Sequence, residues 1–150
     1  MAGLHIDDFY ADATQIIVSL YGVFPRPVTL FAEDICGPDE PDEYGVHCHR
    51  HLACFATFLW LGEEGYLRYK DTIRQDAIDQ VVLSGKCFTA LLSQDSHLIT
   101  GSDENIVKLL PPSVAADQAT LVFHLEMALK SKSSNNVKNA FMPLLNKMSA

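Results

Sequence analysis

The chain has 150 residues, the length of one ordinary domain with a sizeable hydrophobic core. Hydrophobic residues make up 48% of it and charged residues 20%, a globular composition that excludes a disordered tail and a fibre. There are 19 acidic and 11 basic residues, for a formal charge of −8. Because a negative protein repels phosphate backbones at long range, nucleic-acid binding would require a local basic patch.

The N-terminal residues 1–15 carry acidic side chains and no basic one, so we expect neither a signal peptide nor a transit peptide. No apolar run approaches the ~20 residues that cross a bilayer. The four cysteines, Cys36, Cys48, Cys54 and Cys87, form no C-x-x-C pair, which favours thiols over disulfides. We therefore expect a cytoplasmic protein.

Three helices are predicted in the first half of the chain. Apolar residues at helical spacing indicate the first helix over residues 7–21. A short second helix is expected over residues 29–35, with Thr29 as its cap. The third is predicted over residues 46–64 and closes at Gly65, a residue type that favours helix ends.

A hairpin and a further helix follow. Residues 66–69 and 79–83 are typical of two antiparallel strands, joined by a polar turn over residues 70–78. Ser84 is expected to cap a fourth helix that ends near Leu92.

The last third of the chain is predicted to be a helical pair. Ser113 is expected to cap a helix that ends near Leu129. An amphipathic stripe over residues 137–148 indicates the final helix, which Pro143 should kink. The predicted fold class is therefore α+β and mostly helical.

Two stretches of the chain resemble the winged-helix superfamily. Residues 61–69, LGEEGYLRY, are similar to the end of a winged-helix third helix that passes into the first wing strand. Residues 81–92, VVLSGKCFTALL, are similar to the second wing strand and the helix after it, although Cys87 stands where the family often has glycine. The resemblance implies a winged-helix-like core over residues 7–93, with a two-stranded wing. Residues 94–150 would then be a C-terminal helical extension, packed on the core or on a dimer partner.

The resemblance also implies DNA binding, with the third helix in the major groove and the wing along the backbone. In that arrangement Cys54, Phe58 and Leu61 face the core. The opposite face should carry groups that hydrogen-bond to base edges, but it carries the apolar residues Leu52, Phe55, Ala56 and Leu59, with Trp60 nearby. This helix face predicts protein contact rather than base reading.

Positive charge gathers only near the predicted wing. The candidate phosphate-contacting residues are Arg50, Arg68, Lys70 and Arg74. Residues 65–94 carry a net charge of +1, whereas residues 1–64, which contain the third helix, carry −9. This distribution disfavours nucleic-acid binding, and the ordinary interpretation of these residues is a solvated surface.

Histidine and cysteine residues cluster at the start of the third helix. Thiolate and imidazole are the usual ligands of zinc in proteins. His47 and His51 stand four residues apart and could share a helix face, and Cys48 lies between them. A closed structural site requires four ligands, and no second ligand group stands out along the chain. We therefore predict no cofactor, and His47, Cys48 and His51 are the candidate ligands should a metal bind. A pH-sensitive patch is the milder alternative.

Catalytic motifs are missing from the sequence. There is no G-x-S-x-G, no P-loop and no G-x-G-x-x-G. Cys48 has histidine neighbours, but no carboxylate is identifiable that would orient a base. The chain is therefore predicted not to be an enzyme.

The first hypothesis is a non-catalytic, winged-helix-like adaptor or regulator that acts through protein contacts, as a homodimer or with another protein. A DNA-binding transcriptional regulator is the second hypothesis, and a metal- or pH-responsive sensor is the third. The alternative is that the apolar surfaces predicted to form the interface pack on the chain's own domain instead. The predicted interface residues are Leu52, Phe55, Leu59, Trp60, Val137, Phe141, Leu144, Leu145 and Met148.

Overall fold

The computed structural model describes residues 4–38, 42–93 and 120–149. These residues form a mostly helical α+β fold with a small antiparallel sheet of four strands, which confirms the predicted class. The elements in chain order are α1 (Leu4–Val23), β1 (Val28–Phe31), α2 (Ala32–Cys36), α3 (His49–Glu63), β2 (Leu67–Arg68), β3 (Asp71–Ile73), β4 (Ala77–Leu83), α4 (Gly85–Leu92), α7 (Leu121–Ser131) and α8 (Ser134–Ser149).

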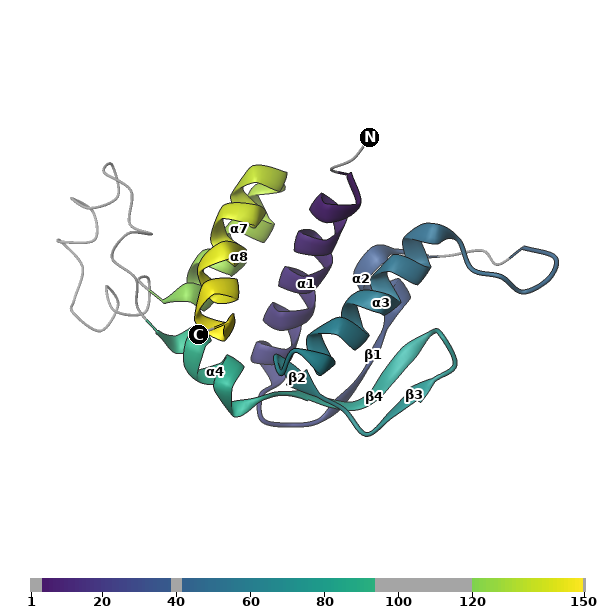
Figure 1. The fold of residues 1–150 in the computed structure, drawn as a ribbon, viewed down its shortest axis with the longest axis horizontal. Coiled ribbons are helices and arrows are strands. Elements are labelled where there is room, and N and C mark those ends of the chain that lie inside the picture. Colours follow the sequence, from purple (N-terminus) through teal and green to yellow (C-terminus); the bar gives the residue numbers. More distant parts are fainter. Residues whose placement is uncertain (1–3, 39–41, 94–119, 150) are drawn as a thin grey trace.

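Helix α1 is the central element of the fold. It lies between α3 on one side and the pair α7 and α8 on the other (Figure 1). Its apolar residues recur at helical spacing, so Ala13, Ile16, Ile17 and Leu20 form one stripe that is almost completely buried. The first predicted helix is therefore confirmed.

Strand β4 is the central strand of the sheet. It pairs antiparallel with β1 on one side and with β2 and β3 on the other. The two strands predicted around the turn are confirmed as β2 and β4, with Leu67 opposite Leu83. The observed turn is shorter than the predicted turn over residues 70–78, because β3 continues the hairpin and places Ile73 opposite Ala77.

The prediction that Thr29 caps the second helix is wrong. Thr29 lies inside β1, and its hydroxyl donates a hydrogen bond of 2.7 Å to Oδ1 of Asp79. The helix begins only at Ala32. The reason is tertiary: the edge of β4 offers hydrogen-bond partners that convert an apolar, β-branched stretch into a strand.

The ends of α3 and α4 follow local signals. Gly65 adopts φ +83°, and the N–H groups of Gly65 and Tyr66 donate to the carbonyls of Gly62 and Leu61, which closes α3 as a Schellman motif. The hydroxyl oxygen of Ser84 accepts from the backbone N–H of Cys87 at 3.1 Å, so the predicted cap of α4 is confirmed.

The C-terminal helices α7 and α8 share the core of the rest of the fold. They pack against α1 and α4, and Phe141 of α8 makes ring contacts with Phe9, Tyr10 and Tyr66. Pro143 lies inside α8, as expected. The predicted cap at Ser113 lies outside the described residues; within them, α7 begins after Thr120. None of the described helices is long and apolar enough to span a membrane.

Candidate functional site

The inward face of α3 is the one that the sequence predicts. Cys54, Phe58 and Leu61 are all fully buried in the core. These side chains lie three and four positions apart, so they form one stripe of the helix that packs on α1 and α2. The remaining faces of α3 decide what the helix can contact.

The outward face of α3 differs from the prediction. Phe55 is only 8% exposed and belongs to the core, while Leu52 and Leu59 are half-buried. The chain itself therefore covers most of the side chains that were expected to require a partner. The exposed stripe of α3 instead consists of His49, Ala53, Ala56, Trp60 and Glu63.

The C-terminal stripe also packs on its own domain, which corrects the expectation of an interface there. Val137, Phe141, Leu144 and Met148 are buried, and Leu145 is half-buried. The reason is that α8 lies against α1 and α4, whose apolar surfaces cover this stripe.

Arg50 is committed to a contact inside the domain. It donates two hydrogen bonds of 2.6 Å to the two carboxylate oxygens of Asp12, which is only 2% exposed, and it lies 3.7 Å from Asp8. The hydrogen bonds to Asp12 raise the pKa of Arg50 above its ordinary value. A guanidinium held in this way is not available for a phosphate, which removes one of the predicted DNA contacts.

Two of the predicted basic residues come together. Arg68 and Lys70 are exposed and line one hollow of about 380 Å³ beside the sheet, with Tyr69 and Gln80. Arg74 lies apart from this hollow, in the turn between β3 and β4, where it adopts φ +52°. The β2–β4 hairpin therefore offers no continuous basic patch, and Asp71, Asp76 and Asp79 match its three basic residues in number.

An apolar groove opens between the N-terminal half of α1 and α3. It has a volume of about 420 Å³. Trp60 is 37% exposed there, and its ring meets that of Phe9 edge-on at 5.2 Å. The residues that line it are His5, Ile6, Phe9, Ala56, Thr57 and Trp60. Exposed aromatic and aliphatic side chains in one groove are typical of a protein-binding surface.

The predicted histidine pair is brought together with a carboxylate. The rings of His47 and His51 stack with their centroids 3.9 Å apart. Nε2 of His47 lies 3.0 Å from Oδ1 of Asp76, and Nε2 of His51 lies 3.8 Å from the same oxygen. Cys48 is exposed and is not part of this group of converging ligand atoms.

The cysteines, all of which lie in the described part of the chain, form no disulfide, as predicted. Burial raises the pKa of the Cys87 thiol to about 12, and burial likewise raises the pKa of Cys54 far above its ordinary value. Both thiols therefore stay protonated at neutral pH, which makes them core residues rather than nucleophiles.

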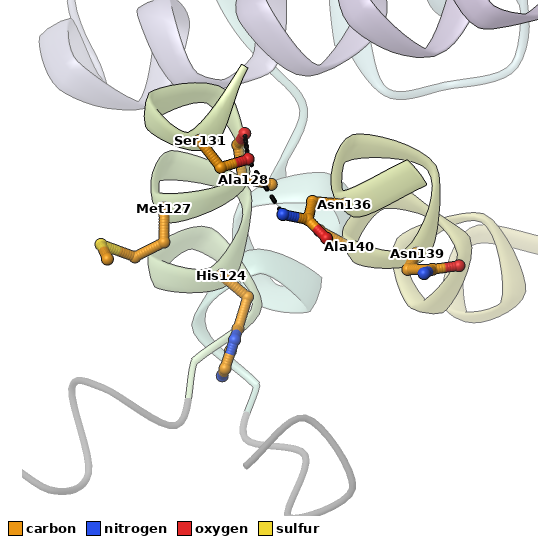
Figure 2. A pocket seen from close by; sticks show the side chains of 7 residues that line it. All are labelled: His124, Met127, Ala128, Ser131, Asn136, Asn139 and Ala140. Carbon is orange, nitrogen blue, oxygen red and sulfur yellow. Dashed lines mark hydrogen bonds between the residues drawn. The ribbon is translucent and has the colours of Figure 1, made fainter. Parts of the chain in front are cut away.

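Figure 2 shows a hollow of about 430 Å³ between α7 and α8. Its residues are His124, Met127, Ala128, Ser131, Asn136, Asn139 and Ala140. Ser131 accepts a hydrogen bond of 3.1 Å from Asn136 and donates one to the carbonyl oxygen of Ala128, so its hydroxyl serves the helix end. Among the described residues that line it there is no carboxylate and no thiol, and we assign no chemistry to it.

Sequence reasoning missed two residues of these sites. Asp76 is 25 positions from His51 and comes close only because the hairpin turns back toward α3, so no spacing signal could have found it. Asp12 is a polar position on the buried side of α1, and a carboxylate there is a signal that a cation must face it.

No family model, curated protein or solved structure matches this chain. Its function is therefore inferred from its own residues.

Proposed function

We propose that this protein is a non-catalytic, winged-helix-like adaptor that binds another protein through the groove between α1 and α3. The order of elements supports the winged-helix part: α1, β1, α2 and α3 are followed by the β2–β4 hairpin and then by α4. The four cysteines form no disulfide, which supports action in the cytoplasm.

The observation that carries the proposal is the exposed stripe of α3. Ala53, Ala56 and Trp60 present apolar surface, and Glu63 adds negative charge. Arg50, the basic residue of this helix, is bound to Asp12. A helix with this surface offers almost no donors to base edges and would repel the phosphates of a major groove.

The described lining of the groove carries no carboxylate, lysine or arginine, so the charge of the two helices that flank it indicates what kind of protein binds it. Helix α1 contains Asp7, Asp8 and Asp12 and has no lysine or arginine. Helix α3 adds Glu63, and Arg50 offsets only one of these charges. A complementary partner is a basic segment with apolar anchors, such as an amphipathic helix that lays its apolar face in the groove. A second copy would bring two acidic surfaces together, so a homodimer through this groove is disfavoured.

Trp60 is the only tryptophan of the chain, so its fluorescence reports directly on this groove. We expect a synthetic amphipathic peptide of leucine and lysine to move its emission to shorter wavelength and to saturate. A peptide of leucine and glutamate should not do so, and duplex DNA should not either. The response to the basic peptide should weaken as salt is added, because exposed charges are screened.

Two variants test whether the peptide binds in the groove. Ala56→Lys places bulk and positive charge on the exposed stripe of α3 and should weaken binding. Asn139→Lys adds the same charge on the exposed surface of α8 and should leave binding unchanged. Equal effects of the two variants, or a Trp60 response to DNA in place of the basic peptide, would overturn the proposal.

The second candidate function is DNA binding through the wing, which the shared hollow of Arg68 and Lys70 favours. Gel shifts with duplex DNA at low and moderate salt distinguish it. Tight binding with a steep salt dependence, abolished in the Arg68→Ala, Lys70→Ala double variant, would support DNA binding. We expect the wild-type protein to show no such binding.

A further inference from the structure

We infer that His47, His51 and Asp76 form a binding site for a divalent transition metal of the Zn²⁺ class, at the junction of α3 and the β3–β4 hairpin. This site is independent of the proposed protein-binding groove. Its three residues come from three places: the loop before α3, the first turn of α3, and the turn of the hairpin.

The separations between the ligand atoms fit one metal ion. All three lie within 4.8 Å of one another. Two ligand atoms bound tetrahedrally to Zn²⁺ at about 2.0–2.1 Å lie about 3.4 Å apart. The distances from Oδ1 of Asp76 to Nε2 of His47 and of His51 are 3.0 and 3.8 Å, one on each side of that value.

The backbone around the site holds the three residues in place. The carboxylate of Asp42 accepts hydrogen bonds from the backbone N–H groups of Tyr44 and Val46, which shapes the loop that leads into His47. The carbonyl oxygen of Asp76 accepts from the N–H of Ala32 at 2.8 Å, so the hairpin turn is tied to the start of α2. Side chains on such supported backbone need little rearrangement to bind an ion.

Burial separates this site from ordinary surface histidines. The side chain of His51 is only 4% exposed, and that of His47 is 16% exposed. Asp76 is more open, at 38%, and so provides the side from which an ion can enter. His49, between the two ligands in sequence, is exposed and lies outside the cluster.

The ligand types select the class of metal. Two imidazoles and one carboxylate suit Zn²⁺, Ni²⁺, Co²⁺ or Cu²⁺, whereas Mg²⁺ and Ca²⁺ prefer oxygen ligands throughout. Three protein ligands leave at least one coordination position for water or an external ligand. Without metal, Nε2 of His51 hydrogen-bonds to the carbonyl oxygen of Gln75 at 2.8 Å, and coordination would replace that contact.

The consequence of binding is a clamp between the hairpin and α3. An ion held by all three residues joins Asp76 to the two histidines with bonds stronger than the present contacts. Because the ion binds only the folded chain at this site, it should raise the melting temperature.

The full chain, purified without a chelator and with any histidine tag removed, should be titrated with ZnCl₂ by calorimetry. We expect one equivalent to bind and the melting temperature to rise. His47→Gln and Asp76→Asn should each weaken binding about 10–100-fold or more and abolish the thermal shift. Neither change removes a fully buried side chain, and circular dichroism verifies the fold of both variants.

His49→Gln and Cys48→Ser are the matched controls, because both residues are exposed neighbours outside the cluster. Both should bind Zn²⁺ as the wild type does. The inference is overturned if the wild type takes up no stoichiometric Zn²⁺. It is equally overturned if either control weakens binding as much as His47→Gln.

Discussion

The guanidinium of Arg50 and the carboxylate of Asp12 form two parallel hydrogen bonds of 2.6 Å, which join α3 to α1. The carboxylate is almost completely buried, while about a third of the Arg50 side chain reaches solvent. This pair explains how a central helix can carry an acidic residue on its buried side. It also joins the first turn of α3, which carries His51, to α1, and these two helices line the groove.

Arg50→Ala should lower the free energy of unfolding by about 2–3 kcal/mol, because it leaves the buried carboxylate of Asp12 without its cation. This expected loss is smaller than the loss for a fully buried ion pair, because the Arg50 side chain is partly solvated. Urea unfolding of Arg50→Ala, of Asp12→Ala and of the double variant that carries both changes gives the coupling energy between the two side chains. A coupling near zero would contradict a stabilising pair. Arg50→Lys should recover only part of the loss, because ammonium cannot bind both oxygens in the same way.

Phe141→Ala should lower the free energy of unfolding by about 3–5 kcal/mol, because the ring is fully buried against Phe9 and Tyr66. Leu145→Ala, at a half-buried position of the same helix, should cost less. Unfolding midpoints should not depend on protein concentration. A midpoint that rises with concentration would instead show that this stripe is covered by a second copy.

Stability should fall as the pH rises above about 9, the ordinary pKa of the thiols of Cys54 and Cys87. Both have raised pKa values in the folded chain, so above pH 9 the unfolded chain loses protons that the folded chain retains. The loss should be about 1.4 kcal/mol per pH unit for each thiol. Urea unfolding at pH 8 and pH 10 measures it.

Cys87→Ala is the variant that isolates one thiol in this pH dependence. It should remove the contribution of that group, so the decrease between pH 8 and pH 10 becomes smaller than in the wild type. An unchanged decrease would show that Cys87 does not titrate differently in the folded and unfolded chains.

Gly65→Ala should destabilise the protein by about 1–2 kcal/mol, because φ +83° places a Cβ in an unfavourable position at the end of α3. Gly22→Ala is the matched control: it lies in the last turn of α1, with no atom within 4 Å of the new Cβ. That substitution should be neutral or stabilise by up to about 1 kcal/mol. Thermal unfolding of both variants compares them, and equal effects would contradict this account.

Local patterns were sufficient to predict much of the fold. The stripe of α1, the cap at Ser84 and the closing Gly65 all act within one or two helical turns. They depend on apolar periodicity and on hydrogen bonds between near neighbours, and both can be predicted from the local sequence. The same holds for the hairpin strands β2 and β4, and for the inward face of α3.

The tertiary structure alone decided the remaining features. β1 is a strand because β4 lies beside it, and Phe55 is buried because α3 rotates that side chain into the core. Asp12 meets Arg50, and Asp76 meets His51, across 38 and 25 positions of chain. Composition and residue spacing do not predict these contacts. The contacts depend on how helices of similar polarity rotate and pack against one another.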